Sequence, residues 1–373
     1  MSEIKYPITR PFMPDQVAFM RYAGQIWDNR WLTHGGPLTE RFQTELCGKL
    51  KVPNTVVFAN GHLALDCALK ALGLHDGEAI TTPFTYLSTT NALSMNGLTP
   101  VFCDIKPSDC TIDETKIEAL ITEKTRVIVP VHVYGFPCNY KAIEDIARRH
   151  NLKVVYDAAH VFGVEVDGRG IGSFGDASMF SFHATKVFHT VEGGAVTFCD
   201  SLLRDTLISA KNFGFDATGD APTVSLNAKM TELHAAVGLS NLEIIDEQIA
   251  KRKLLVKRYL ERLQDVPQLK LFCWDDPTVK YNYAYFPVLV NHNAKVDRDT
   301  LVSRLLDECG IQTRKYFYPL ISDLACYRAA HNSDDTPIAK DISARVLTLP
   351  LYVELTTEDV DNICDSVRAI LIG

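Results

Sequence analysis

Residues 181–198 read SFHATKVFHTVEGGAVTF, and a single lysine, Lys186, lies between two segments that are both typical of buried strands. A surface lysine normally lies on a solvated helix or loop, because burying its charge costs free energy unless that charge is lost or used. The position of Lys186 therefore predicts a role beyond solubility, and the surrounding sequence indicates which one.

The region around this stretch alternates between short apolar runs and helix-period segments. Runs that are apolar throughout are typical of strands covered on both faces, and strand–helix alternation favours a mostly parallel sheet with helices on either side. We expect an α/β domain with seven strands, at residues 55–59 (TVVFA), 78–82 (EAITT), 100–104 (PVFCD), 126–133 (RVIVPVHV), 153–157 (KVVYD), 178–182 (SMFSF) and 194–198 (GAVTF).

Outside this block the pattern predicts further helices and a second domain. Leu38, Phe42, Leu46 and Leu50 lie four residues apart and mark one face of a helix, and residues 229–264 read as one or two long helices. Strands are expected at YAYFPVLV (283–290) and IQTRKYF (311–317), with a closing helix after TTEDVDN (356–362). We therefore expect a large domain over residues 1–245 and a smaller α+β domain over 246–373.

The composition excludes several classes of function. The 373 residues carry a net charge of −8, which argues against general binding to nucleic acid or to an anionic membrane. Neither a signal peptide nor an apolar run of the ~18–20 residues needed to span a membrane is expected. The ten cysteines are scattered without a CxxC pair, which favours reduced thiols, no metal site and a cytoplasmic location.

One motif that spells a dinucleotide fingerprint is in the wrong context. Gly170, Gly172 and Gly175 match GxGxxG, but such a site needs its glycines after a strand and at the start of a helix. Here they follow a loop and lead into a strand, so a turn is the better interpretation.

Three features at strand ends predict the chemistry. Asn60-Gly61-His62 ends a strand and opens a helix, whose free N–H groups suit a phosphate, although many such turns bind nothing. Asp157, with His160 three residues later, ends another strand, where a carboxylate can face a ligand or simply cap a turn.

Lys186 follows a third strand end, close to Ser181 and His183. A lysine partly withdrawn from water can lose its proton and form a Schiff base with an aldehyde. A lysine for the aldehyde, a carboxylate for the ring nitrogen and a helix terminus for the phosphate are the three anchors that pyridoxal phosphate requires.

At this point the chain resembles the DegT/StrS-like family of pyridoxal-phosphate nucleotide-sugar aminotransferases over nearly its whole length. The motifs that carry the resemblance are WLTHGGPLTERF (31–42), NGHLAL (60–65), PFTYLSTTNAL (83–93), YDAAHVFG (156–163), SFHATKVFHTVEGG (181–194), LNAKMTELHAAVGL (226–239), RKYFYPL (314–320) and RVLTLPLY (345–352). The resemblance implies pyridoxal-phosphate fold type I, with L-glutamate as amino donor and the pyridoxamine form between the two half-reactions.

The resemblance also implies a role for each matching residue. Lys186 holds the cofactor and shuttles the proton, while Asp157 pairs with the ring nitrogen. The remaining cofactor contacts are His160 at the ring hydroxyl, Tyr86 stacked on the ring, Ser181, Gly61 and His62 at the phosphate, and Asn227 reaching the phosphate across a subunit boundary. A homodimer with shared active sites is therefore implied.

Four positions depart from the family pattern: His62 replaces Thr, Phe136 replaces Gln, Tyr156 replaces an acidic residue and Lys229 replaces Arg. The lysine motif resembles members that aminate C4 of a 4-keto-6-deoxy sugar more than those that aminate C3. We expect dTDP-4-keto-6-deoxyglucose as substrate and a 4-amino-4,6-dideoxy sugar nucleotide as product, in lipopolysaccharide O-antigen or antibiotic sugar synthesis. Amination at C3 and a UDP-linked sugar are the alternatives.

Candidate substrate contacts are Thr33, His183, Arg314, Lys315 and Tyr316. Arg314 and Lys315 could equally be solvated charges at a strand edge. Two other classes remain open, namely another pyridoxal-phosphate enzyme such as a lyase, and a catalytically silent relative used as a sensor. The presence of both Lys186 and Asp157 argues against the silent relative.

Overall fold

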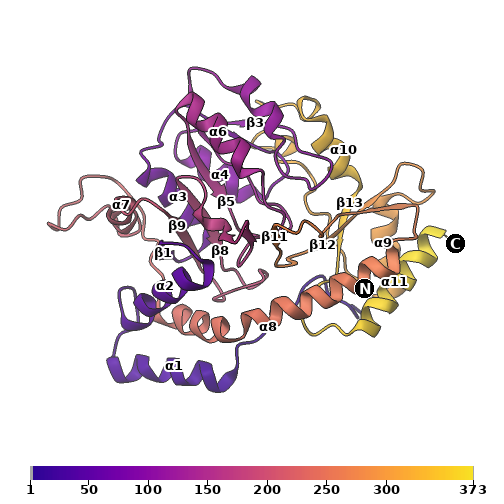
Figure 1. The fold of residues 1–373 in the computed structure, drawn as a ribbon, viewed down its shortest axis with the longest axis horizontal. Coiled ribbons are helices and arrows are strands. Elements are labelled where there is room, and N and C mark those ends of the chain that lie inside the picture. The colour runs from indigo at the N-terminus through magenta and orange to yellow at the C-terminus, as the bar shows by residue number, and fades with distance from the viewer. Residues whose placement is uncertain (1–2, 373) are drawn as a thin grey trace.

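The computed structural model describes residues 3–372 and contains the predicted seven-stranded sheet at its centre (Figure 1). Its strand order is β1-β9-β8-β5-β4-β2-β3, and β9 is antiparallel to both of its neighbours whereas the other pairs are parallel. The strands are β1 (Asn54–Phe58), β2 (Glu78–Thr81), β3 (Thr99–Phe102), β4 (Thr125–Ile128), β5 (Lys153–Asp157), β8 (Ala177–Ser181) and β9 (Gly194–Phe198). All seven expected strands are confirmed.

Helices cover both faces of this sheet, which explains why its strands are apolar throughout. Successive strand residues belong to two different cores: Val57 and Ile128 pack on one face, and Val56 and Val127 on the other. The helices of this part of the chain are α1 (Gln16–Asn29), α2 (Pro37–Leu50), α3 (Gly61–Ala71), α4 (Leu87–Met95), α5 (Glu114–Ile117), α6 (Tyr140–His150) and α7 (Leu203–Ala210).

The second half of the chain is built around a long helix and a small antiparallel sheet. Helix α8 (Glu232–Leu263) runs unbroken for 32 residues, packing first on α1 and α2 and later on α11 (Thr357–Ile372). The small sheet has the order β10 (Leu269–Leu271), β12 (Phe286–Val290), β13 (Val346–Leu349), and α9 (Arg298–Cys309) and α10 (Pro337–Arg345) lie beside it. The expected domain boundary near residue 245 lies inside α8, and the division into domains stays a prediction.

Two expectations on local structure have clear outcomes. The closing helix is confirmed as α11, but the strand expected at residues 311–317 is wrong, because only Ile311 and Arg314 form isolated bridges there. The GxGxxG segment is confirmed as a turn: β7 (Arg169–Gly170) leads through a short 3₁₀ turn at Ile171–Ser173 into β8. With β6 (Glu165–Val166) and β11 (Val279–Lys280), β7 forms a third, very small sheet.

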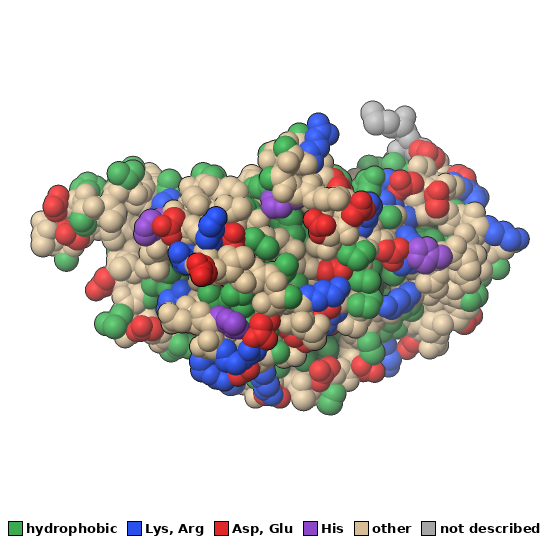
Figure 2. Space-filling model, turned by 90° about the horizontal axis from the view of Figure 1, so that it is seen from above, with side chains coloured by type: hydrophobic (Ala, Val, Ile, Leu, Met, Phe, Trp, Pro, Cys, Tyr) green, Lys and Arg blue, Asp and Glu red, His purple; other side chains and the backbone are tan. Residues whose placement is uncertain are grey.

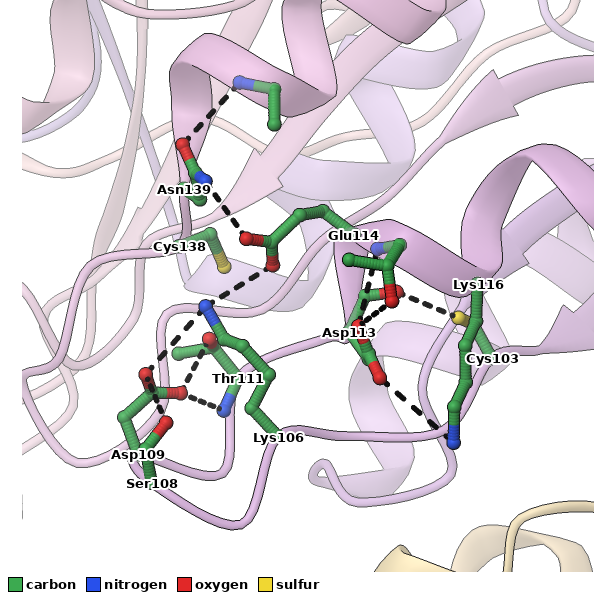
Figure 3. A network of polar contacts seen from close by, with 12 residues as sticks. Cys103, Lys106, Ser108, Asp109, Thr111, Asp113, Glu114, Lys116, Cys138 and Asn139 are labelled. Atoms are coloured by element: carbon green, nitrogen blue, oxygen red, sulfur yellow. Dashed lines mark hydrogen bonds and ion pairs between the residues drawn. The ribbon is translucent and has the colours of Figure 1, made fainter.

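A polar network fixes the segment after β3 against the start of α6 (Figure 3). The Lys106 ammonium lies 3.1 Å from the Glu114 carboxylate, which also accepts a 2.8 Å hydrogen bond from the Asn139 side chain. Asn139 in turn caps α6 by accepting from the backbone N–H of Ala142. These contacts join the segment after β3 to the start of α6, next to the central sheet.

Three further findings on the described residues concern membrane-spanning helices, metal-binding clusters and disulfides. Between residues 3 and 372, no helix is both long enough and apolar enough to cross a membrane. The same residues contain no cluster of His, Cys, Asp and Glu suited to a metal ion, and their ten cysteines are free thiols.

Candidate active site

The predicted strand-end features meet in one pocket of about 530 Å³ at the carboxyl edge of the central sheet. This is the edge at which open α/β sheets bind their ligands. Ten of the residues singled out from the sequence line it: Gly61, His62, Tyr86, Asp157, His160, Ser181, His183, Lys186, Arg314 and Tyr316.

The turn between β1 and α3 forms one end of the pocket. Asn60 caps α3, because its side chain accepts a 2.9 Å hydrogen bond from the backbone N–H of Leu63. Gly61 packs so closely on β8 that a Cβ atom there would lie 2.9 Å from Ser181 Cβ. The backbone N–H groups at the start of α3 and the Ser181 hydroxyl can therefore approach the same anion.

His62, which lacks the hydroxyl of the usual threonine, has a hydroxyl beside it. Its Nδ1 atom lies 2.9 Å from Ser88 Oγ at the start of α4, and both residues line the pocket. Ser88 therefore places a hydroxyl group at this end of the pocket.

Asp157 ends β5 and holds a nearly fully buried carboxylate at the base of the pocket. One oxygen accepts from the Thr89 hydroxyl at 2.7 Å and the other from the Ala159 backbone N–H at 3.0 Å. Burial raises the pKa of Asp157, while these two hydrogen bonds and the charge of Lys186 act in the opposite direction. The carboxylate is poised to pair with a cationic group entering the pocket.

His160 is buried beside Asp157 in a single tautomer. The backbone N–H of Tyr134 donates to its Nδ1 atom at 3.2 Å, so Nδ1 must be the unprotonated nitrogen. Burial lowers the pKa of His160 well below its ordinary value, which keeps the ring neutral. The Nε2–H group is then a donor, as binding to a ring hydroxylate requires.

Lys186 lies in the loop between β8 and β9 and lines the pocket together with Asp157 and His160. Its backbone N–H donates to the carbonyl of His183 at 2.9 Å, and the loop returns to the sheet where Phe182 donates to Gly193. These bonds fix the loop in which the half-buried Lys186 reaches the pocket.

Charged and aromatic side chains surround the outer part of the pocket. His183 Nε2 lies 3.6 Å from the Glu192 carboxylate, and both belong to the Lys186 loop. Arg314 lies over the ring of Tyr316 at 4.6 Å, and Tyr86 is 56% exposed at the start of α4. These groups can contact a polar, anionic substrate above the buried base of the pocket.

Three of the predicted residues lie outside this pocket. Lys315 forms a 2.7 Å ion pair with Asp299, Thr33 is exposed before α2, and Asn227 is exposed and bridges to Asn212 through its backbone. The other departures from the family pattern lie away from the lysine: Tyr156 stacks on His132, Phe136 contacts Trp274, and the Lys229 ammonium bonds the Asn212 side chain.

Some pocket residues were missed from the sequence. Thr85, Ser88, Glu192 and Phe317 line the pocket, and Thr89 bonds Asp157 from behind it. Each lies within a stretch that carries the family resemblance, but hydroxyl side chains near a helix start are too common to stand out.

The residues fit pyridoxal phosphate. The close approach of Gly61 to Ser181 opens backbone donors toward a phosphate, and the buried Asp157 carboxylate suits a protonated pyridine nitrogen. Lys186 lines the same pocket as both, so aldehyde, ring nitrogen and phosphate each have a partner.

Comparison with known proteins decides the family. The model of the DegT/DnrJ/EryC1/StrS aminotransferase family matches residues 15–368. The chain belongs to this family. Membership makes the protein an aminotransferase with pyridoxal phosphate as its cofactor, and confirms the predicted enzyme class and cofactor.

Individual relatives extend over the same length. A dTDP-4-amino-4,6-dideoxy-D-glucose transaminase from Shigella dysenteriae is 39% identical over 363 residues, which cover 97% of this chain and 98% of the relative. The structure of DesI, solved in the presence of its TDP-sugar product, is 34% identical with a TM-score of 0.93 and covers 99% of this chain and 94% of DesI. Spr1654 from Streptococcus pneumoniae, in its PMP form, is 25% identical with a TM-score of 0.91 and covers 100% and 98% of the two chains.

Proposed function

We propose that this protein transfers the amino group of L-glutamate to a nucleotide-linked 4-keto-6-deoxy sugar, with dTDP-4-keto-6-deoxyglucose as the substrate. The products are 2-oxoglutarate and a 4-amino-4,6-dideoxy sugar nucleotide. The observation that carries the proposal is one pocket holding Lys186, Asp157 and the turn at Gly61, in a chain 39% identical along its length to a transaminase named for this product.

Pyridoxal phosphate supplies, when bound, an aldehyde that accepts the amino group and a cationic ring that withdraws electrons from the reacting carbon. Asp157 would keep the proton on the ring nitrogen, and His160 would donate its Nε2–H to the ring oxygen. Ser181 and the first-turn N–H groups of α3, beginning at Gly61 and His62, would bind the phosphate. Tyr86 would cover the face of the ring.

Lys186 carries the proton transfers. Its Nζ atom would serve as the base that takes the proton from the α-carbon of glutamate and as the acid that returns a proton on the cofactor side of the amino nitrogen, so that the nitrogen passes from donor to cofactor. The second half-reaction runs these steps in reverse on C4 of the keto sugar. The half-buried position of Lys186 in its loop would keep the amine within the pocket for both proton transfers.

We assign recognition of the sugar nucleotide to the outer pocket. Arg314 provides a positive charge for an anionic substrate, and His183, Glu192 and Tyr316 provide hydrogen-bonding groups for sugar hydroxyls. Lys315 contributes less, because Asp299 already neutralises it. Thr33 is exposed outside the pocket and would act only on a neighbouring subunit's substrate.

We further propose that the protein works as a homodimer with shared active sites. Asn227 is exposed and does not line the pocket of its own chain, which suits a contact with the phosphate of a second copy. Val17, Met20 and Trp27 form an exposed apolar stripe on α1 at helical spacing. Phe213, Phe215 and Val224 are exposed on the loop after α7, which projects from one end of the molecule (Figure 1, Figure 2).

A cytoplasmic location accompanies this proposal, because ten free thiols suit a reducing compartment. The product would suit the synthesis of a polysaccharide such as lipopolysaccharide O-antigen.

The test is product analysis with a matched panel of keto sugars. The enzyme is incubated with L-glutamate and dTDP-4-keto-6-deoxyglucose, its UDP-linked counterpart, or a 3-keto sugar nucleotide, and the products are identified by mass spectrometry and NMR. We expect amination at C4 with the dTDP sugar giving the highest kcat/KM. A higher kcat/KM with the UDP or 3-keto sugar would overturn the substrate assignment, and release of a deaminated or dehydrated product would favour a lyase.

A further inference from the structure

Two buried threonine hydroxyl groups, one just before helix α4 and one within it, form a hydrogen-bonded series that ends on the Asp157 carboxylate. Thr89 Oγ1 lies 2.7 Å from Asp157 Oδ2, and Thr85 Oγ1 lies 2.9 Å from Thr89 Oγ1. Thr89 is fully buried and Thr85 is 2% exposed. The same short segment, residues 85–89, also carries Tyr86 and Ser88 at the pocket wall.

The direction of each of these two hydrogen bonds follows from which group has a proton to donate. A threonine hydroxyl has one proton, and an ionised carboxylate can only accept, so Thr89 donates to Asp157. Thr89 then has no proton left, and Thr85 must donate to it. Hydrogen bonds that point the same way polarise one another and strengthen the last bond, which here is the one to the carboxylate.

We propose that Thr89, supported by Thr85, is a positioning residue that keeps the Asp157 carboxylate ionised and aimed at the ring nitrogen of the cofactor. This inference rests on the proposed function, because it assigns Asp157 to the cofactor ring. The new element is that two threonine hydroxyl groups, rather than a second charged side chain, keep the buried Asp157 carboxylate ionised.

The surroundings of Asp157 leave this task to few groups. Burial raises the pKa of Asp157, and the groups that act against burial are the Thr89 hydroxyl, the Ala159 N–H and the charge of Lys186. The nearby His160 is neutral because burial lowers its pKa. Lys186 is the residue assigned to hold the cofactor, so the two hydrogen bonds are the support that remains dedicated to Asp157. Of these two, only the Thr89 bond can be removed by changing a side chain.

The test compares three substitutions in α4 and a fourth, Thr85→Val, in the segment just before it, by their affinity for pyridoxal phosphate, measured by absorbance titration of the apoprotein between pH 6 and pH 8.5. Thr89→Val keeps the shape and removes the hydroxyl, and Thr89→Ser restores it. Thr90→Val is the matched control, because Thr90 is equally buried on the same turn but its hydroxyl bonds the Leu87 carbonyl.

We expect Thr89→Val to weaken cofactor binding roughly 10- to 100-fold, as the loss of a hydrogen bond to a charged group predicts. The loss should increase as the pH falls, since without Thr89 the carboxyl group takes up its proton at a higher pH and can no longer pair with a cationic ring. Thr89→Ser should restore affinity, and Thr85→Val should give a smaller loss in the same direction.

Equal affinities for Thr89→Val and Thr90→Val would overturn this role of Thr89, as would a loss in Thr89→Val that does not change with pH or that Thr89→Ser does not restore. If Thr89→Val does not fold, the sign and pH dependence of the Thr85→Val effect decide instead. Failure of the unmodified protein to bind pyridoxal phosphate would overturn the proposed function itself, so the two failures are distinguishable.

Discussion

Asp157 is a buried side chain with a negative charge. This combination lowers the stability of the apoprotein but suits the binding of a cationic cofactor. Burial raises the pKa of Asp157 in the chain without ligand, so the ionised group opposes folding at neutral pH. A cationic ring nitrogen would reverse this balance by pairing with the carboxylate. Asp157 therefore destabilises the apoprotein at neutral pH and would stabilise the complex with the cofactor.

The substitution Asp157→Asn tests this balance in two measurements. The amide oxygen can accept from the Ala159 N–H while the amide NH2 group donates to Thr89 Oγ1, so the site stays hydrogen-bonded without a charge. We therefore expect the apoprotein to melt at a higher temperature than the unmodified protein at pH 7. A carboxyl whose pKa is raised on folding costs stability above its unfolded pKa, so this advantage should vanish as the pH falls toward about 4. Calorimetry at several pH values measures it.

The same variant should bind pyridoxal phosphate roughly 10- to 100-fold more weakly and lose most of its aminotransferase activity, because the ring nitrogen loses its charged partner. Asp157→Glu is the control that retains the charge but displaces it. Near-normal turnover of Asp157→Asn would show that the carboxylate has a different role.

At the residue scale, sequence reasoning found the residues whose type is unusual for their position. Lys186 stood out because a lysine between two buried strands has few structural reasons to be there, whereas Asp157, which could simply have capped a turn, gained weight only in combination with Lys186 and the Gly61 turn. Thr89 could not be found in this way, because its role depends on the packing of α4 against the end of β5. Lys315 gave the same signal as Arg314, but in the structure Arg314 lines the pocket whereas Lys315 lies outside it and pairs with Asp299.

At the scale of elements, the proposed phosphate site depends on the turn from β1 into α3. Gly61 is required there by space, since an added Cβ would lie 2.9 Å from Ser181 Cβ and 3.1 Å from its Cα. Any larger side chain must push α3 away from β8, and with it the N–H groups that face the pocket.

We therefore expect Gly61→Ala to cost about 1–3 kcal/mol of stability and to weaken cofactor binding, as seen by thermal unfolding and by absorbance titration. Gly48→Ala is the matched control. Gly48 lies in α2, where an added Cβ meets nothing within 4 Å, so this change should not lower stability or cofactor affinity. If Gly61→Ala binds the cofactor like the unmodified protein, the phosphate does not bind at this turn.

The elements of the central sheet were predictable because their apolar runs are continuous and bounded by turns, as at β4 and β9. The segment 311–317 misled because alternation at IQTRKYF imitates a strand, whereas tertiary contacts leave only bridges at Ile311 and Arg314. β6, β7 and β11 are two residues long and therefore carry no periodic signal.

At the scale of the whole molecule, the exposed apolar side chains are concentrated near α1 and the loop after α7. Trp27 is 71% exposed and Val224 97% exposed, which is unfavourable for a surface that stays in water. The homodimer proposed above would bury them and bring Asn227 to the second pocket. Neither the pairing nor its geometry could be predicted from hydrophobic periodicity alone.

The substitution Trp27→Glu should weaken the dimer by at least about 10-fold in Kd, because large aromatic side chains dominate protein interfaces. It should leave the fold of each chain intact, since Trp27 packs on the outside of α1. Analytical ultracentrifugation across a dilution series measures the Kd, and Lys257→Ala on exposed α8 is the control. An unchanged dimer would exclude α1 from the interface, and a monomer that stays fully active would exclude shared sites.

The most direct test of the central claim is the visible absorption spectrum of the protein reconstituted with pyridoxal phosphate, recorded before and after L-glutamate is added. The assignment of Lys186 predicts a band from the lysine-linked cofactor that glutamate removes and that the keto sugar then restores. Lys186→Ala should lack this band and should not turn over. A Lys186→Ala variant that transfers amino groups at the normal rate would contradict the account, and so would a wild-type band that does not respond to glutamate.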